Sequence, residues 1–181
     1  KQINEKNLKF INFKKVNNTN NTAINIIKSS NLDHGMIITK TQKNGKGQYG
    51  RKWISYKKNL FLNFFFNINN INLSTNKLTK INCLLVKKFL TNFYTKKIIF
   101  KAPNDLLING KKISGILQET IIKNNNKYLV VGIGINLVKS PNIKNYPTTN
   151  LLELIGIKID YKFAVNLLRS IFEKNLLKYN K

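Results

Sequence analysis

The sequence is poor in residue types on which many functional sites depend. It contains one cysteine, one histidine and one tryptophan, and 7 acidic residues stand against 32 lysines and arginines. The single Cys83 excludes an internal disulfide and suits a reducing compartment. Because it lies in an apolar stretch, we expect a buried structural thiol. The lone His34 and the lack of a second cysteine exclude a zinc site of the usual ligand types.

Long hydrophobic runs are also missing. No apolar stretch approaches the roughly 18 residues of a membrane span, and the Lys- and Asn-rich start of the chain lacks the apolar core of a secretory signal. We therefore expect a soluble, cytoplasmic protein without membrane association. With 181 residues, of which 42% are hydrophobic, the chain is long enough for one domain with a sizeable core.

Positive charge is present in excess. The formal net charge is +25, but the lysines are spread along the whole sequence and occur together with abundant Asn, Ile and Phe. This pattern is typical of compositional drift in an A/T-rich genome, and a selected polyanion partner is the alternative. In either case the charge favours fast encounter with acidic proteins and weak, salt-sensitive binding of nucleic acid.

Periodic hydrophobic patterns predict strands and helices in mixed order. The expected strands span residues 8–16, 36–41, 60–68, 98–101, 106–108, 112–122 and 128–135. The expected helices span residues 23–28 and 74–93, with a short helix capped by Asn150 and a last helix capped by Asp160. Asn109-Gly110 is a strong hairpin signal. We therefore expect an α+β fold in which an antiparallel-rich mixed sheet is backed by helices.

Residues 45–53, Gly-Lys-Gly-Gln-Tyr-Gly-Arg-Lys-Trp, combine backbone freedom with positive charge. The glycines let backbone amides approach a ligand closely. Lys46, Arg51 and Lys52 supply cations, and Trp53 supplies a flat apolar face. The combination suits an anionic, ring-bearing ligand such as a nucleotide. Taken alone, the segment is more typical of a flexible, solvated loop.

Two further segments place polar groups and glycines at strand ends. Residues 101–105, Lys-Ala-Pro-Asn-Asp, are followed across the hairpin by residues 112–117, Lys-Ile-Ser-Gly-Ile-Leu. A carboxylate can hold Mg²⁺ or a ribose, and a lysine can neutralise phosphate oxygens. Residues 131–137, Val-Gly-Ile-Gly-Ile-Asn-Leu, place two glycines on one face of a strand. Either a neighbouring backbone or a planar ligand lying on the sheet fills the space above them.

Taken together, these segments resemble the biotin protein ligase family. Its members show a Gly-Arg-Gly-Arg-x-Gly-Arg-x-Trp-like loop, then Lys-Trp-Pro-Asn-Asp, Lys-x-x-Gly-Ile-Leu and a Gly-x-Gly-x-Asn strand, and this chain matches them in the same order. The upstream Ser-Thr-Asn motif has its counterpart in residues 18–20, Asn-Thr-Asn. The resemblance implies a mixed, mostly antiparallel sheet of about seven strands, as in lipoate ligases and class II aminoacyl-tRNA synthetases.

The resemblance also implies the site residues. The implied biotin-binding residues are Asn18, Thr19, Asn20, Gln42, Gly45, Lys46, Gly47, Trp53, Lys112, Gly115, Leu117, Gly132 and Gly134. The implied ATP-binding residues are Arg51, Trp53, Asn104, Asp105, Lys112 and Asn136. Lys112 and Arg51 are the expected catalytic cations, and Asp105 is a candidate ligand of Mg²⁺.

In the family, ATP activates biotin to biotinyl-5′-AMP, and biotin is then transferred to a lysine of a biotin carboxyl carrier domain, such as that of acetyl-CoA carboxylase. We expect residues 1–181 to be a single catalytic domain, without an N-terminal helix-turn-helix or a C-terminal SH3-like barrel, and without specific DNA binding. Family members occur as monomers and as dimers, and the sequence does not choose between them.

Several positions depart from the family pattern. Asn18 replaces Ser, Lys46 replaces the first loop Arg, and Ala102 replaces Trp. Gln48 replaces the second loop Arg, which in the family helps to retain the adenylate, so we expect a leaky enzyme that releases biotinyl-AMP readily. The alternatives are a lipoate-type ligase on the same fold and an inactive, basic homologue that binds a ligand or nucleic acid.

Overall fold

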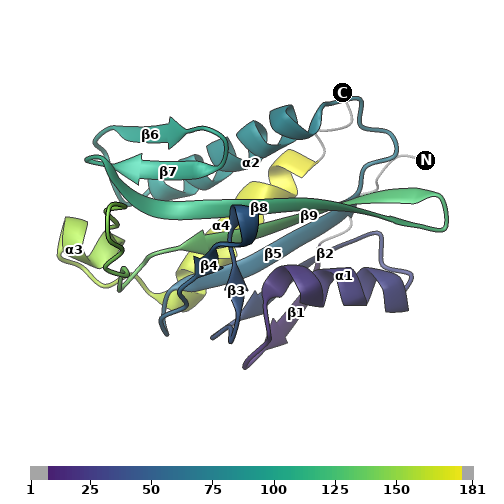
Figure 1. The fold of residues 1–181 in the computed structure, drawn as a ribbon, viewed down its shortest axis with the longest axis horizontal. Helices are drawn as coiled ribbons and strands as arrows, with labels where there is room; N and C mark the ends of the chain where they lie inside the picture. The colour runs from purple at the N-terminus through teal and green to yellow at the C-terminus, as the bar shows by residue number, and fades with distance from the viewer. Residues whose placement is uncertain (1–7, 177–181) are drawn as a thin grey trace.

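A seven-stranded sheet runs through the whole molecule, with helices on both of its faces (Figure 1). This computed structural model describes residues 8–176. The strands of the sheet are β1 (Lys9–Phe13), β2 (His34–Thr39), β5 (Leu60–Asn67), β6 (Ile98–Lys101), β7 (Asp105–Ile108), β8 (Lys111–Lys123) and β9 (Asn126–Ile135). They are ordered β1-β2-β5-β9-β8-β7-β6. β1 pairs with β2 in parallel and the other pairs of this sheet are antiparallel, which confirms the expected mixed α+β fold.

The helices and a small hairpin form the outer layers. They are α1 (Thr19–Ser29), α2 (Thr75–Leu90), α3 (Leu151–Ile155) and α4 (Tyr161–Leu176), with strands β3 (Gly45–Lys46) and β4 (Lys52–Trp53). α2 and α4 cover one face of the sheet, while α1 and the β3–β4 hairpin lie on the other (Figure 1). None of the helices within residues 8–176 has the length and apolar character needed to cross a bilayer.

Side chains of the central strand β5 pack against the helices on both faces of the sheet. Residues 60–66 are all buried because side chains on both faces of β5 are covered. Phe64 faces α4 and stacks on Phe172, with ring centroids 4.0 Å apart and planes at 8°. Phe65 faces α1 and joins Ile37 in the smaller apolar cluster. Alternation along one strand therefore builds two separate cores.

Two tight turns place the strands that form the site. Asn109 and Gly110 have φ values of 50° and 74°, as a two-residue type I′ turn requires, and they join β7 to β8 as expected. Asn124 and Asn125 also have positive φ and join β8 to β9. The long β8–β9 ladder brings Gly115 opposite Gly134 and Leu117 opposite Gly132.

Some boundaries differ from the sequence-based expectation. α1 begins at Thr19, before the expected start, because the Asn18 side chain caps it by accepting from Asn21 N at 2.8 Å. In α4, Phe163 is 56% exposed, and residues such as Leu168 and Phe172 form the buried face. Cys83 is buried, as expected.

Candidate active site

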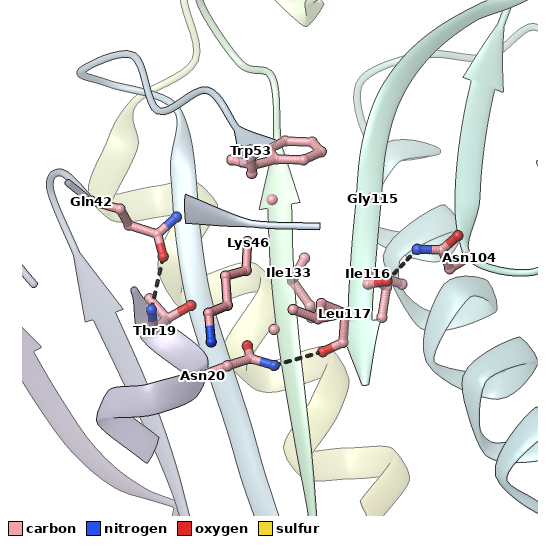
Figure 2. Close-up of a pocket in the computed structure, with 12 residues that line it drawn as sticks. Thr19, Asn20, Gln42, Lys46, Trp53, Asn104, Gly115, Ile116, Leu117 and Ile133 are labelled. Atoms are coloured by element: carbon pink, nitrogen blue, oxygen red, sulfur yellow. Dashed lines mark hydrogen bonds between the residues drawn. The ribbon is translucent and has the colours of Figure 1, made fainter. Parts of the chain in front are cut away.

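A cleft lies on the α1 side of the sheet, over the middle of β8 and β9. It is lined by Thr19, Asn20, Gln42, Lys46, Trp53, Asn104, Gly115, Ile116, Leu117, Gly132, Ile133 and Gly134. In Figure 2 α1 and the Gln42 segment stand on one side, β8 stands on the other, and Trp53 lies above β9. Ten of these twelve residues are among those implied by the family resemblance, and they come from five different segments of the chain.

The three glycines of the floor are packed against planar side chains. A Cβ at position 134 would collide with the indole of Trp53, and a Cβ at position 115 would lie 2.9 Å from Trp53 Cζ3. A Cβ at position 132 would collide with Asn20 Oδ1. Glycine is therefore required at these strand positions because an indole and an amide lie directly on the sheet.

The first turn of α1 forms one end of the cleft. Asn18 is buried as the helix cap, whereas Thr19 and Asn20 line the cleft. The backbone N–H of Thr19 donates to Gln42 Oε1 at 2.8 Å, and Gln42 Nε2 donates to Ser55 Oγ at 3.2 Å. Gln42 is thus held in one orientation by partners on both sides.

Asn20 is fixed by two residues that the sequence analysis did not single out. Its Nδ2 donates to Leu117 O at 3.1 Å and to Glu119 Oε2 at 2.6 Å, and its Oδ1 accepts from Asn63 Nδ2 at 2.8 Å. Asn63 is fully buried on β5. The signal that could have revealed it is an amide between Leu62 and Phe64 in an otherwise apolar strand.

The glycine-rich segment is a short hairpin in this structure. Gly45 pairs with Trp53, and Lys46 pairs with Lys52. A Cβ at position 45 would collide with Trp53 O, so glycine allows the two strands to approach. Lys46 Nζ donates to Asn21 Oδ1 at 3.1 Å and so ties the hairpin to α1. Gly47 leads into a turn of 3₁₀ helix at Gln48–Gly50.

A charged cluster lies beside the Trp53 end of the cleft. Lys112 Nζ is 2.7 Å from Asp105 Oδ1 and 5.3 Å from the centroid of the Trp53 ring. Tyr146 donates a hydrogen bond from its hydroxyl to Asp105 Oδ2. The centroid of the Tyr146 ring is 5.5 Å from Lys112 Nζ and 5.0 Å from Lys101 Nζ. This cluster brings the expected catalytic lysine and the expected metal ligand into one ion pair.

Tyr146 keeps its proton in this cluster. Burial raises the pKa of its hydroxyl to about 12, together with the hydrogen bond to Asp105 and that residue's negative charge, while the positive charge of Arg51 acts in the opposite direction. Tyr146 therefore remains a donor to Asp105 across the physiological range. No local sequence pattern marks it, because residues 140–149 form an irregular connector.

The remaining expected residues have different environments. Arg51 is exposed on the hairpin and Asn104 donates to Ile116 O at 2.6 Å within the cleft. Asn136 is buried outside the cleft lining, and its Nδ2 donates to Thr149 O at 3.1 Å. Arg51 and Asn136 thus lie outside the cleft lining, although the backbone N–H of Asn136 donates to Ile113 O, next to Lys112, at 2.9 Å.

A metal site is not assembled by protein side chains alone. Within residues 8–176, His, Cys, Asp and Glu side chains form no group of three that could hold an ion. Asp105 is a single carboxylate already paired with Lys112. Mg²⁺ often binds through one carboxylate together with substrate phosphates, so the residues present fit an ion that arrives with a nucleotide.

Comparison with known proteins shows the family to which this chain belongs. The model of the biotin/lipoate A/B protein ligase family matches residues 12–136, more than half of the chain. The chain belongs to this family. The structure of a biotin protein ligase from Aquifex aeolicus in complex with biotin and ATP superposes with a TM-score of 0.80 at 27% identity, covering 95% of this chain and 72% of that one. The resemblance inferred from the sequence motifs is thereby confirmed.

Relatives within the ligase family include longer proteins. The bifunctional ligase/repressor BirA of Bacillus subtilis is 27% identical over 172 residues, which cover 91% of this chain and 52% of BirA. The chain thus spans about half the length of this relative. A lipoate complex of LipL1 from P. falciparum has a TM-score of 0.54 at 16% identity and covers 92% of this chain and 63% of that one, which shows the shared fold alone.

Proposed function

We propose that this chain activates biotin with ATP to biotinyl-5′-AMP and then transfers biotin to a lysine of a biotin carboxyl carrier domain. The observation that supports this most is the cleft itself, which joins a polar end at Asn20 to a cationic end at Lys112 across a glycine floor. The likeness to a biotin protein ligase that binds biotin and ATP supports the same conclusion. A cytoplasmic location stays a prediction.

In the proposed complex, biotin spans the two ends of the cleft. Its ureido ring lies near Thr19, Asn20 and Gln42, which supply an ordered set of hydrogen-bonding groups. The valeryl chain runs beneath the β3–β4 hairpin, and the carboxylate lies near Lys112. Asn18 contributes indirectly, because it caps the helix that presents Thr19 and Asn20.

The reaction requires positioning and charge neutralisation and no covalent enzyme intermediate. An oxygen of the biotin carboxylate attacks the α-phosphorus of ATP, and the bond to the bridging oxygen of the leaving pyrophosphate breaks. Lys112 neutralises both anions as they approach, which is the kind of stabilisation that lowers such barriers most. The neutral amine of the acceptor lysine then attacks the acyl carbon, AMP leaves, and a proton passes to solvent.

Asp105 and Arg51 complete the proposed nucleotide site. Asp105 would hold Mg²⁺ together with nucleotide phosphates, and Arg51 would contact phosphate from the exposed side of the hairpin. Because Lys112 is paired with Asp105, a phosphate that recruits Lys112 frees the carboxylate at the same time. Tyr146 then remains as the hydrogen-bond donor that keeps Asp105 in place.

The test is biotin-dependent exchange of pyrophosphate into ATP. Wild-type protein should show exchange, and Lys112→Ala should lower its rate by roughly 100-fold or more, since charge stabilisation of this kind is typically worth that much. Lys111→Ala is the matched control, because Lys111 is adjacent, half-exposed and 3.9 Å from Glu153 outside the cleft. It should retain exchange. No exchange in folded wild-type protein would refute the proposed activity.

The same assay separates the alternatives. Exchange that depends on lipoate instead of biotin would show a lipoate ligase. Salt-sensitive binding of DNA or RNA without exchange for either acid would show a basic binding protein. Transfer is then measured by mass spectrometry of an added biotin carrier domain, whose mass should increase by one biotinyl group.

A further inference from the structure

The amide of Asn20 is held by three protein groups at the end of the cleft. Its nitrogen donates to Leu117 O, as Figure 2 shows, and to the carboxylate of Glu119, while its oxygen accepts from Asn63 Nδ2. Glu119 lies on β8 and Asn63 lies on β5, on either side of the strand that contains Gly132. The two strands that flank β9 therefore fix one side chain of the cleft.

Glu119 and the Leu117 carbonyl together set which way this amide points. A carboxylate and a backbone carbonyl can only accept hydrogen bonds from the Asn20 nitrogen, so the oxygen must face away from them, toward Asn63. Asn63 must then present its own nitrogen to that oxygen. The orientation of two amides is thus set in series, and Glu119 supplies the shorter of the two hydrogen bonds that hold the Asn20 nitrogen.

This arrangement leaves an unsatisfied group. Asn63 Oδ1 is buried and has no hydrogen-bond partner among the described residues. A buried acceptor without a partner lowers stability. A network that served packing alone would avoid this loss with an apolar residue at position 63, like its neighbours Leu62 and Phe64. The retained amide indicates a role for the direction in which Asn20 points.

Because the Asn20 amide is fixed, this end of the cleft presents a hydrogen-bond acceptor to a ligand. Asn20 Oδ1 lies against Gly132, where a Cβ would collide with it. This oxygen has one hydrogen bond from Asn63, so a second lone pair remains available. A ligand that lies on the floor can therefore donate an N–H to Asn20, whereas both hydrogens of the Asn20 nitrogen are already engaged by Leu117 and Glu119.

We propose that Glu119 and Asn63 are positioning residues that hold Asn20 as a hydrogen-bond acceptor, so that the cleft selects ligands whose ring has an N–H group. The inference rests on the proposed function, in which the ureido ring of biotin lies at this end. That ring has two N–H donors, whereas the dithiolane ring of lipoate has none. The two positioning residues thereby determine specificity without touching the ligand.

The experiment is calorimetric binding of biotin and of biotin methylated at its ureido nitrogens. In wild-type protein, methylation should weaken binding by about tenfold or more, because it leaves a buried acceptor unpaired. In Glu119→Gln, whose amide can also donate, only Leu117 O still requires a donor from Asn20, so the orientation is held less strongly and the ratio of the two affinities should fall at least about threefold. A purely structural role would weaken both ligands equally and leave the ratio unchanged.

A charge-conserving double variant tests the direction of the amide itself. Glu119→Gln combined with Asn63→Asp moves the carboxylate to β5, where it attracts the Asn20 nitrogen toward position 63 and Gly132 in competition with Leu117 O. The affinity for biotin should then fall by about tenfold or more, and methylation of the ureido nitrogens should no longer lower it further. Glu153→Gln is the matched control, because it makes the same change at a carboxylate outside the cleft, 3.9 Å from Lys111.

The results that would overturn this inference differ from those that would refute the proposed function. Binding of biotin by wild-type protein with no effect of methylation would overturn the inference and leave the ligase activity standing. An unchanged affinity ratio in folded Glu119→Gln would also overturn it. Wild-type protein that does not bind biotin at all would refute the proposed function and the inference together.

Discussion

Gln48 occupies the tip of the β3–β4 hairpin, where the resemblance implies an arginine that retains the adenylate. It lies in the 3₁₀ turn next to Tyr49, which has a φ of 55° and is 89% exposed. Lys46 is tied to Asn21 on α1 at 3.1 Å, and the other cations of the hairpin, Arg51 and Lys52, are exposed. The retention of a phosphate here therefore depends on exposed side chains.

Replacement of Gln48 by arginine should slow the release of biotinyl-AMP. A charge-assisted hydrogen bond contributes about 1.5–3 kcal/mol, which corresponds to a roughly ten- to hundredfold lower dissociation rate. The rate is measured by chasing labelled biotinyl-AMP with unlabelled ligand. Gln118→Arg, on the side of β8 near α2, serves as a control that adds the same charge elsewhere. Equal rates in wild type and Gln48→Arg would contradict the expectation of a leaky enzyme.

Cys83 should be inert to thiol reagents while the protein is folded. Burial raises the pKa of its thiol to about 12, and the negative charge of Asp105 adds to the shift. Since the thiolate is the reactive form, labelling at mildly alkaline pH should follow global unfolding. Labelling by a chromogenic disulfide reagent, with and without urea, measures this, and rapid labelling without denaturant would contradict it.

At the level of single residues, the sequence predicted many of the residues that line the cleft, but not the distant residues that hydrogen-bond to them. Gly132, Gly134 and Trp53 belong to local motifs with a recognisable spacing, so they were found. Asn63 and Tyr146 act through partners about 43 and 41 positions away in the sequence, Asn20 and Asp105. No local pattern marks such long-range pairs.

At the level of elements, a stacked ring pair contributes to the packing of α4 on the sheet. Phe172→Ala should lower the free energy of unfolding by about 3–5 kcal/mol, because it leaves a cavity against Phe64. Phe163→Ala is the matched control on the same helix. Phe163 is 56% exposed and meets Phe93 edge-on at 6.2 Å, so the loss should stay below about 1 kcal/mol. Urea denaturation measures both, and equal losses would contradict the assigned helix face.

The elements that the sequence predicted correctly are those with strong local signals. The β7–β8 hairpin follows from Asn109-Gly110, and β5 follows from its run of apolar residues. β3 and β4 were not predicted, because each is two residues long and has no room for a periodic pattern. The first turn of α1 was not predicted, because its polar residues cap the helix or line the cleft and so do not show helical hydrophobic spacing.

At the level of the whole molecule, charge repulsion opposes folding. The formal net charge is +25, and residues 8–176 contain three side-chain ion pairs. Raising the ionic strength from about 0.01 M to about 0.15 M shortens the Debye length from roughly 30 Å to roughly 8 Å. Tm should therefore rise with salt, as followed by differential scanning calorimetry. A Tm that falls over this range would show that self-repulsion is not the dominant electrostatic effect.

The contact between Leu8 and α4 has a consequence for protein engineering. Leu8 N donates to Glu173 Oε1 at 3.0 Å, and Arg169 donates to Leu8 O at 3.1 Å. Leu8 also belongs to the apolar cluster under α2 and α4, on the side of the sheet opposite the cleft. A short linker could therefore join these two regions in a circular permutant opened at the exposed turn Asn124–Asn125, with the cleft and its glycine floor left uncut.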